Sequence, residues 1–137
     1  MKHVFTYGSL MFAPVWGRVV IGQYESSPAT IHGFRRFSVI GKEHPGLVIQ
    51  KGAPPMLGRV YFNVSDEDIA RLDQFETERY LRVSVAVTIE EDAFAAETYM
   101  ALNLDELSDT DWDVSHFERE GLPKFLTTYV AQHAPPK

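Results

Sequence analysis

The chain alternates apolar and polar residues between Leu81 and Ile89, and this pattern restricts its fold more than any other feature. Every second position holds Leu, Val or Ile, and the positions between them include Arg82 and Ser84. A period of two predicts a β-strand with one buried and one solvent-facing side. Glu91-Asp92 then turns the chain into a second strand over Phe94–Leu102, so the pair is predicted to form an antiparallel hairpin.

Shorter segments rich in β-branched and aromatic residues precede this hairpin and also predict strands. The predicted strands are Val4–Tyr7, Ala29–Ile40 with a bulge at Gly33, Leu47–Ile49 and Leu57–Val64. Turn residues separate them at His44-Pro45-Gly46 and in the loop Lys51–Pro55.

Helices are predicted in three places. Pro14 suits the first turn of a helix that runs to about Val20. Ser65 is expected to cap a second helix, in which acidic residues occupy the first turn. Its apolar positions Ile69, Leu72 and Phe75 share one face, and the helix is expected to stop near Glu76 or Thr77. The final third is expected to be helical, with a capping box of Ser115 and Glu118 and a second segment from Pro123 to about Gln132.

These elements predict the α+β class with a mostly antiparallel, curled sheet, because strands and helices do not alternate regularly along the chain. Periodicity leaves open whether the sheet closes into a small barrel. The length of 137 residues favours a single domain over 1–137.

Composition excludes several functional classes. The net charge of −6 argues against a nucleic-acid-binding surface. No apolar run approaches the ~20 residues that cross a bilayer, and the N-terminus does not resemble a signal peptide. With no cysteine, the chain has no disulfides, thiol nucleophiles or thiolate metal ligands. We therefore expect an intracellular, cytoplasmic protein. The five histidines lack metal-binding spacing, and no phosphate-binding glycine motif is present.

The first candidate functional place is Tyr7-Gly8-Ser9-Leu10, where a strand ends in a glycine turn before a helix. Successive backbone N–H groups in such a turn are able to point at one spot and hold a carboxylate or an oxyanion. An ordinary strand-to-helix turn is the alternative. Ser9 lacks the second glycine of a nucleophile elbow, so a serine hydrolase has weak support and needs a nearby base.

Glu76 is the second candidate. It lies four positions after Leu72 at the predicted helix end, where the helix dipole and apolar neighbours both raise the pKa of a carboxyl group. A raised pKa suits a proton shuttle near neutral pH. The alternative is a solvated glutamate at a helix end. Asp73 and Glu78 are expected to face water.

Together these segments resemble the gamma-glutamylcyclotransferase-like superfamily, and its AIG2-like branch in particular. The matching segments, in order, are Val4–Leu10, Gly58–Tyr61, Leu72–Glu76 and Tyr80–Arg82, with Trp112 and Phe117 similar to the C-terminal part of the family. The resemblance extends from Val4 to about Tyr129. Thr77 departs from it, because many relatives have Gly after the glutamate.

The resemblance implies a small mixed, mostly antiparallel barrel-like sheet with flanking helices and a pocket at one end. It implies a cyclisation in which the α-amine of a γ-glutamyl small molecule attacks its own γ-carbonyl, which gives 5-oxoproline and releases an amine or amino acid. Glu76 would move the proton, and Tyr7, Gly8, Ser9, Leu10 and Tyr80 would bind the substrate. No metal or organic cofactor is implied. A binding module of the same fold without turnover is the alternative, and the sequence leaves the leaving group and the oligomeric state open.

Overall fold

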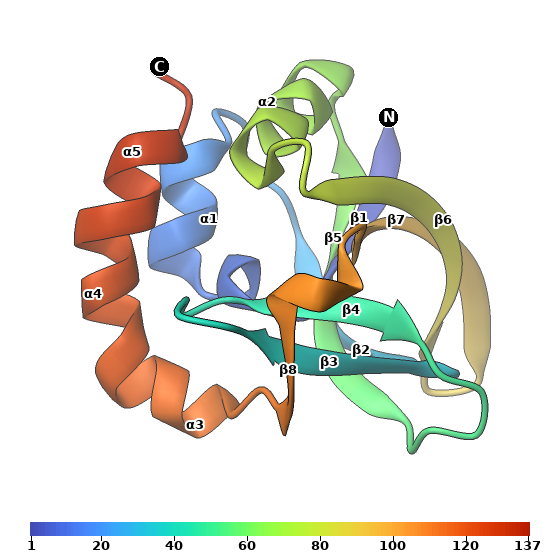
Figure 1. The fold of residues 1–137 in the computed structure, drawn as a ribbon. Coiled ribbons are helices and arrows are strands. Elements are labelled where there is room, and N and C mark those ends of the chain that lie inside the picture. Colours follow the sequence, from blue (N-terminus) through green and yellow to red (C-terminus); the bar gives the residue numbers. More distant parts are fainter.

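The structure of the chain, a computed structural model, describes residues 1–137 (Figure 1). Its strands are β1 (Lys2–Thr6), β2 (Ser26–Ile31), β3 (Phe34–Val39), β4 (Pro45–Ile49), β5 (Met56–Val64), β6 (Tyr80–Ile89), β7 (Asp92–Ala101) and β8 (Leu107–Asp111). The isolated helices are α1 (Ala13–Val19) and α2 (Asp66–Glu76), with short 3₁₀ turns at Ser9–Met11 and Leu104–Glu106. A C-terminal helical run covers Val114–His133 and contains α3 (Val114–His116), α4 (Leu122–Phe125) and α5 (Ala131–His133), separated by π-helical turns.

Five strands close into a barrel in the order β1-β5-β2-β6-β7. All neighbours in it are antiparallel except β1 and β7, which meet in parallel at Val4 and Glu97. The predicted α+β class with a mixed, mostly antiparallel, barrel-like sheet is therefore confirmed. Closure pairs β1 with strands on both of its sides, so neither β1 nor β7 is left as an open edge of the barrel.

The long hairpin is also confirmed, since β6 pairs with β7 from Tyr80 opposite Ala101 to Ile89 opposite Asp92. The turn residues are 90 and 91, one position earlier than expected. Val87 is fully buried, whereas Leu81 is 51% exposed. The apolar face of β6 is therefore buried near Val87 but lies outside the core at the start of the strand, at Leu81.

The predicted single strand Ala29–Ile40 is wrong, because the chain reverses there and forms β2 and β3 in two different sheets. Gly33 has φ +81°, so it belongs to the reversal and not to a bulge. β3 lies between β4 and β8 in a separate three-stranded sheet. The turn expected at His44–Gly46 is misplaced, since β4 already begins at Pro45.

The C-terminal region differs from the prediction in two ways. It includes β8, whose polar sequence Leu-Ser-Asp-Thr-Asp has no apolar period of its own. The helical run is capped by Asp113, whose carboxylate accepts from the N–H of His116 at 3.0 Å, and not by Ser115. Pro123 does stand in the first turn of α4, and the run ends at His133, close to the predicted end. Figure 1 shows this run beside α1.

Two apolar cores result from this arrangement. One fills the barrel and includes Phe5, Ile31 and Val60. The other lies between the barrel and the helices and includes Leu72 and Phe125. No helix is long and apolar enough to cross a membrane.

Candidate active site

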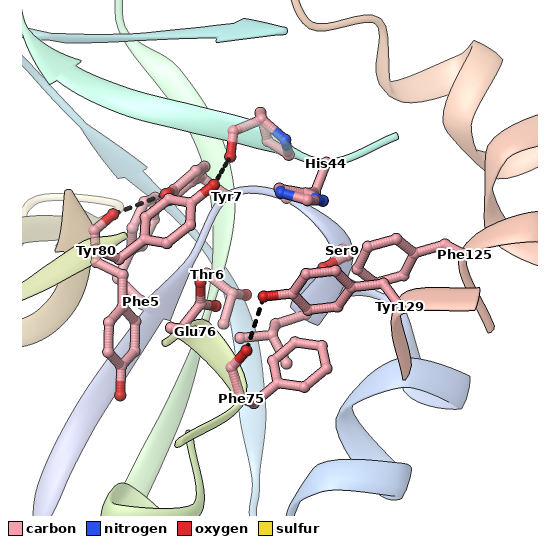
Figure 2. Close-up of a pocket in the computed structure, with 14 residues that line it drawn as sticks. Phe5, Thr6, Tyr7, Ser9, His44, Phe75, Glu76, Tyr80, Phe125 and Tyr129 are labelled. Carbon is pink, nitrogen blue, oxygen red and sulfur yellow. Dashed lines mark hydrogen bonds between the residues drawn. The ribbon is translucent and has the colours of Figure 1, made fainter. Parts of the chain in front are cut away.

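A pocket lies where the two cores meet, at the end of the barrel that the C-terminal helical run covers (Figure 2). The chain segments that form it are the turn after β1, the start of β4, the end of α2, parts of β6 and β7, and α4 with the following π turn. Its lining residues are Phe5, Thr6, Tyr7, Gly8, Ser9, Leu10, His44, Pro45, Phe75, Glu76, Tyr80, Tyr99, Phe125 and Tyr129. All six residues predicted as site residues are among them.

The turn after β1 brings its backbone close to the start of β4. A Cβ atom on Gly8 would lie 2.7 Å from Cγ of Pro45, so only glycine fits without displacing the proline. The N–H of Gly8 makes no hydrogen bond within the protein. This N–H is therefore available to an acceptor on a ligand, as the glycine turn predicted.

Ser9 is buried, and its side chain makes no hydrogen bond to another residue. A serine nucleophile needs a base within hydrogen-bonding reach. His44 and Glu76 line the same pocket, yet neither is bonded to Ser9. The structure therefore lends no support to the serine-hydrolase alternative.

Glu76 is the last residue of α2, and the helix itself places it in the pocket. The hydroxyl of Ser65 caps the helix start by accepting from the N–H of Asp68 at 3.2 Å. Leu72 and Phe75 are both fully buried, so the last turn is fixed against the core. The predicted helix, its cap and its buried face are confirmed.

Thr77 ends α2 with φ +69°, in the left-handed region. A β-branched residue is strained there, whereas glycine adopts this conformation freely. This conformation explains why many relatives have Gly at the position of Thr77. Thr77 keeps the turn in place at some conformational cost.

Burial raises the pKa of Glu76 to about 8, and the nearby charge of Asp73 adds to the rise. No side chain or backbone group of the protein donates a hydrogen bond to its carboxyl group. A desolvated carboxyl without donors favours the protonated form, because nothing replaces the lost water. The direction of the predicted shift is thus confirmed, and burial is its main cause.

The carboxyl group is surrounded by the four tyrosines of the pocket wall, Tyr7, Tyr80, Tyr99 and Tyr129, and none of their hydroxyls donates to it. Tyr7 donates to the carbonyl of Tyr99 at 2.7 Å, and Tyr129 donates to the carbonyl of Phe75 at 2.9 Å. Tyr80 donates to the carbonyl of Pro45 at 2.8 Å, so it fixes β4 against β6 as part of the pocket wall (Figure 2). Because these protons are committed elsewhere, Glu76 is free to bond with a ligand.

Asp73 does not simply face water, contrary to the prediction. Its Oδ1 accepts from the hydroxyl of Tyr99 at 2.6 Å and pairs with Nε of Arg82 at 3.0 Å. A sequence pattern on α2 alone does not show partners that come from β6 and β7. Glu78 is exposed, as predicted.

Sequence reasoning did not assign the other residues of the pocket wall to the site, among them His44, Tyr99, Phe125 and Tyr129. Phe125 and Tyr129 are four positions apart on the C-terminal run, and their rings stack at 5.1 Å. That spacing signals a buried helix face, but it does not show which part of the barrel the face covers. His44 carries no signal in the sequence at all. No group of three or more His, Cys, Asp or Glu side chains is placed to hold a metal ion.

Comparison with known proteins agrees with the fold. Residues 4–114 match the family model for gamma-glutamyl cyclotransferase, AIG2-like. AIG2-like protein D of Arabidopsis thaliana is 30% identical over 131 residues, which cover 92% of this chain and 85% of the relative. A solution structure of an Arabidopsis thaliana protein, 28% identical, superposes with a TM-score of 0.70 over 93% of this chain and 87% of that one. A solved gamma-glutamyl cyclotransferase shares the fold at 15% identity, with a TM-score of 0.60 over 99% of this chain and 89% of that one.

Proposed function

The chain belongs to the AIG2-like gamma-glutamyl cyclotransferase family, and we propose that it converts a γ-glutamyl compound into 5-oxoproline and a free amine or amino acid. The observation that carries the proposal is the carboxyl group of Glu76. It lies in the pocket with its pKa raised to about 8 and with no hydrogen-bond partner of its own.

The reaction needs little more than a folded substrate and a proton carrier. The α-nitrogen forms a bond to the γ-carbonyl carbon, and the bond from that carbon to the leaving nitrogen breaks. The α-ammonium loses two protons as it becomes the ring N–H, and the leaving nitrogen gains two as it departs as an ammonium. Atoms and charges therefore balance without another reactant. Because nucleophile and carbonyl belong to one molecule, the protein mainly holds the reactive conformer.

Glu76 is suited to carry these protons. In the free protein its carboxyl is mostly protonated at neutral pH, given a pKa of about 8. A bound α-ammonium is an opposite charge, which lowers the pKa of the carboxyl and turns it into a carboxylate base. The carboxyl is then able to take a proton from the ammonium and pass it to the leaving nitrogen.

The turn from Tyr7 to Leu10 would bind the substrate's α-carboxylate or its developing oxyanion. The unbonded N–H of Gly8 supports this role, since an N–H aimed at growing negative charge stabilises it. Tyr80 would complete the wall that holds the glutamyl part, with its hydroxyl fixed on Pro45.

The test is a panel of γ-glutamyl amino acids and γ-glutamyl amines incubated with the purified protein, with the products identified by mass spectrometry. Cyclisation yields 5-oxoproline, and we expect it from at least one compound. Release of glutamate instead would indicate a hydrolase. Binding without any product would indicate a binding module, and either result would overturn the proposal.

A further inference from the structure

We propose, building on the cyclisation proposed above, that Arg36 is a positioning residue of the site. Its guanidinium holds the peptide between Tyr7 and Gly8, so that the N–H of Gly8 is fixed toward the substrate and donates a stronger hydrogen bond. Arg36 lies on β3 in the three-stranded sheet and does not line the pocket. It therefore acts on the substrate through this peptide and not by direct contact.

The side chain of Arg36 reaches from its own sheet to the turn after β1. Its Nη1 donates to the carbonyl oxygen of Tyr7 at 2.6 Å. No backbone N–H of the protein donates to that carbonyl. A hydrogen bond from a charged donor is shorter and stronger than a bond between neutral groups. One charged contact thus ties the turn to the second sheet.

The bond to the carbonyl of Tyr7 also determines the direction of the N–H of Gly8, because both groups belong to one peptide unit. No peptide bond of the chain is cis, and in a planar trans peptide the C=O and the N–H point in opposite directions. The N–H of Gly8 therefore points away from Arg36. Glycine adopts either sign of φ, so this peptide would turn easily if nothing held its carbonyl. The bond from Arg36 removes that freedom.

The ring of Trp112 keeps the guanidinium in place. Cζ of Arg36 lies 5.4 Å from the centroid of this ring, within the range of a cation–π contact. The backbone N–H of Trp112 donates to the carbonyl of Arg36 at 3.3 Å, and its Nε1 donates to the carbonyl of Glu43 at 2.7 Å. Because Trp112 is itself buried and bonded at both ends, the contact between Arg36 and Tyr7 is part of a fixed arrangement.

Arg36 also brings a positive charge to the back of the turn. The carboxylate of Asp111 acts on it but is bonded to the neighbouring Arg35 at 2.6 Å. Burial lowers the pKa of Arg36, yet a guanidinium remains charged at neutral pH. A charged donor on the carbonyl polarises the peptide and makes its N–H a stronger donor. Both effects favour a negatively charged group of the substrate at the N–H of Gly8.

Arg35 offers a matched control, since it is the adjacent residue of the same strand and its side chain points to the opposite face. It is paired with Asp111, and its guanidinium lies over the ring of Phe37 at 4.5 Å. It neither bonds to Tyr7 nor lines the pocket. Arg35→Met therefore removes an arginine from β3 without releasing the turn.

The first measurement is the amide nitrogen resonance of Gly8 in the ligand-free protein. A hydrogen bond on the preceding carbonyl deshields this nitrogen, so its resonance should move upfield in Arg36→Met and stay in place in Arg35→Met. The resonances of the hairpin of β6 and β7 report whether each variant is folded. Arg36→Lys keeps a charged donor and most of the packing, so it is the second variant. Its Gly8 resonance should lie between those of the wild type and Arg36→Met, or simply upfield of the wild type where Arg36→Met does not fold.

The second measurement is kcat/KM for 5-oxoproline release from a γ-glutamyl compound that the protein cyclises. We expect Arg36→Met to lower it by about 10–100-fold, the usual range for the loss of a hydrogen bond to a charged group. Arg36→Lys should recover part of this loss, and Arg35→Met should match the wild type. A higher KM would indicate that the N–H of Gly8 binds the α-carboxylate, and a lower kcat that it binds the oxyanion. Both results support the positioning role.

An unmoved Gly8 resonance or an unchanged kcat/KM in the Arg36 variants would overturn the positioning role while cyclisation itself stands. An equal loss of kcat/KM in Arg35→Met would also overturn it, because the effect would then belong to β3 as a whole. If no compound of the panel gives 5-oxoproline, the proposed function fails. The Gly8 resonance then still decides whether Arg36 holds the peptide.

Discussion

The hydroxyl of Tyr99 donates to Oδ1 of Asp73 over 2.6 Å, and this bond connects the barrel wall to the helix that carries Glu76. The same oxygen is paired with Nε of Arg82 at 3.0 Å. Asp73 lies three positions before Glu76 on α2, and its charge is one cause of the raised pKa of Glu76. The carbonyl of Tyr99 in turn accepts from Tyr7. One residue of β7 thus contacts both candidate segments of the site.

Asp73→Asn should lower the pKa of Glu76, because it removes a like charge that disfavours the carboxylate. Asparagine still offers an oxygen to Tyr99 and Arg82. We expect the acid limb of the pH profile of kcat/KM to move down by about half to one pH unit. Glu67→Gln, an exposed change in the first turn of α2, is the control and should leave the limb in place. An unmoved limb in Asp73→Asn would show that this charge does not tune the site.

Glu76→Gln should lower kcat by ~10²–10⁴-fold, the usual contribution of a general acid–base group. Glutamine keeps the shape of the side chain but carries no transferable proton, so KM should change little. Steady-state release of 5-oxoproline is the measurement. Glu91→Gln, in the exposed turn between β6 and β7, should match the wild type. Equal rates for wild type and Glu76→Gln would remove Glu76 from the mechanism.

Glu76 should also make the fold less stable as the pH rises. Its pKa is about 8 in the folded protein and about 4.5 when unfolded, so between these values the folded state binds more protons. The free energy of unfolding therefore falls as the pH rises from about 4.5 to 8. Glu76→Gln removes this loss, and at pH 8 it should be more stable than wild type by about 1–3 kcal/mol, less than the full shift implies because the pocket admits water. Urea titrations at pH 4.5 and pH 8 measure the difference, and a gain of the same size at both would refute the assignment.

Gly8→Val should abolish ligand binding, since its Cβ atom would meet Pro45 at 2.7 Å and displace the turn from β4. The strands β6 and β7 pair with each other without this turn, and the amide resonances of the hairpin should be unchanged away from Tyr80 and Tyr99, which lie against it. Binding of 5-oxoproline, followed by calorimetry, is the measurement. Unaltered affinity in Gly8→Val would show that the turn takes no part in the site.

Two glycine substitutions should have opposite effects on stability. A Cβ atom on Gly58 would lie 2.3 Å from the carbonyl oxygen of Thr6, inside the barrel wall, so Gly58→Ala should cost about 1–3 kcal/mol or more. Nothing lies within 4 Å of the corresponding position at Gly17 in α1, so Gly17→Ala should stabilise by about 0.5–1 kcal/mol. Urea unfolding of both variants is the test, and a Gly58→Ala protein as stable as the wild type would contradict the close approach.

Local patterns were sufficient where one segment specifies its own structure. The alternation in β6 and the capped, three-residue apolar stripe of α2 correctly predicted those two elements. The buried face was correct for α2, whereas in β6 Val87 is buried and Leu81 is 51% exposed. They were insufficient where a change of direction or of partner decides the structure. β2 and β3 look like one strand because both favour extended backbone, and β8 pairs with β3 through its backbone although its side chains are polar.

The candidate site was predicted in the same uneven way. Tyr7–Leu10 and Glu76 each stand at the end of a recognisable element, so a glycine turn and a helix end were visible in the sequence. His44 lies in a bend of the chain, and Phe125 and Tyr129 lie on the C-terminal helical run. No local sequence pattern shows where that run packs against the barrel.

The sequence by itself determined that this chain has a long hairpin, a capped helix ending at Glu76 and a glycine turn after its first strand, because each depends on neighbours within a few residues. Only the tertiary structure decided that the sheet closes, that the turn and the helix end share one pocket, and that the pKa of Glu76 reaches about 8. Closure depends on β1 meeting β7, and the pKa depends on how completely distant segments remove water from one carboxyl group. Both depend on contacts between residues far apart in the chain, which no local sequence pattern can predict.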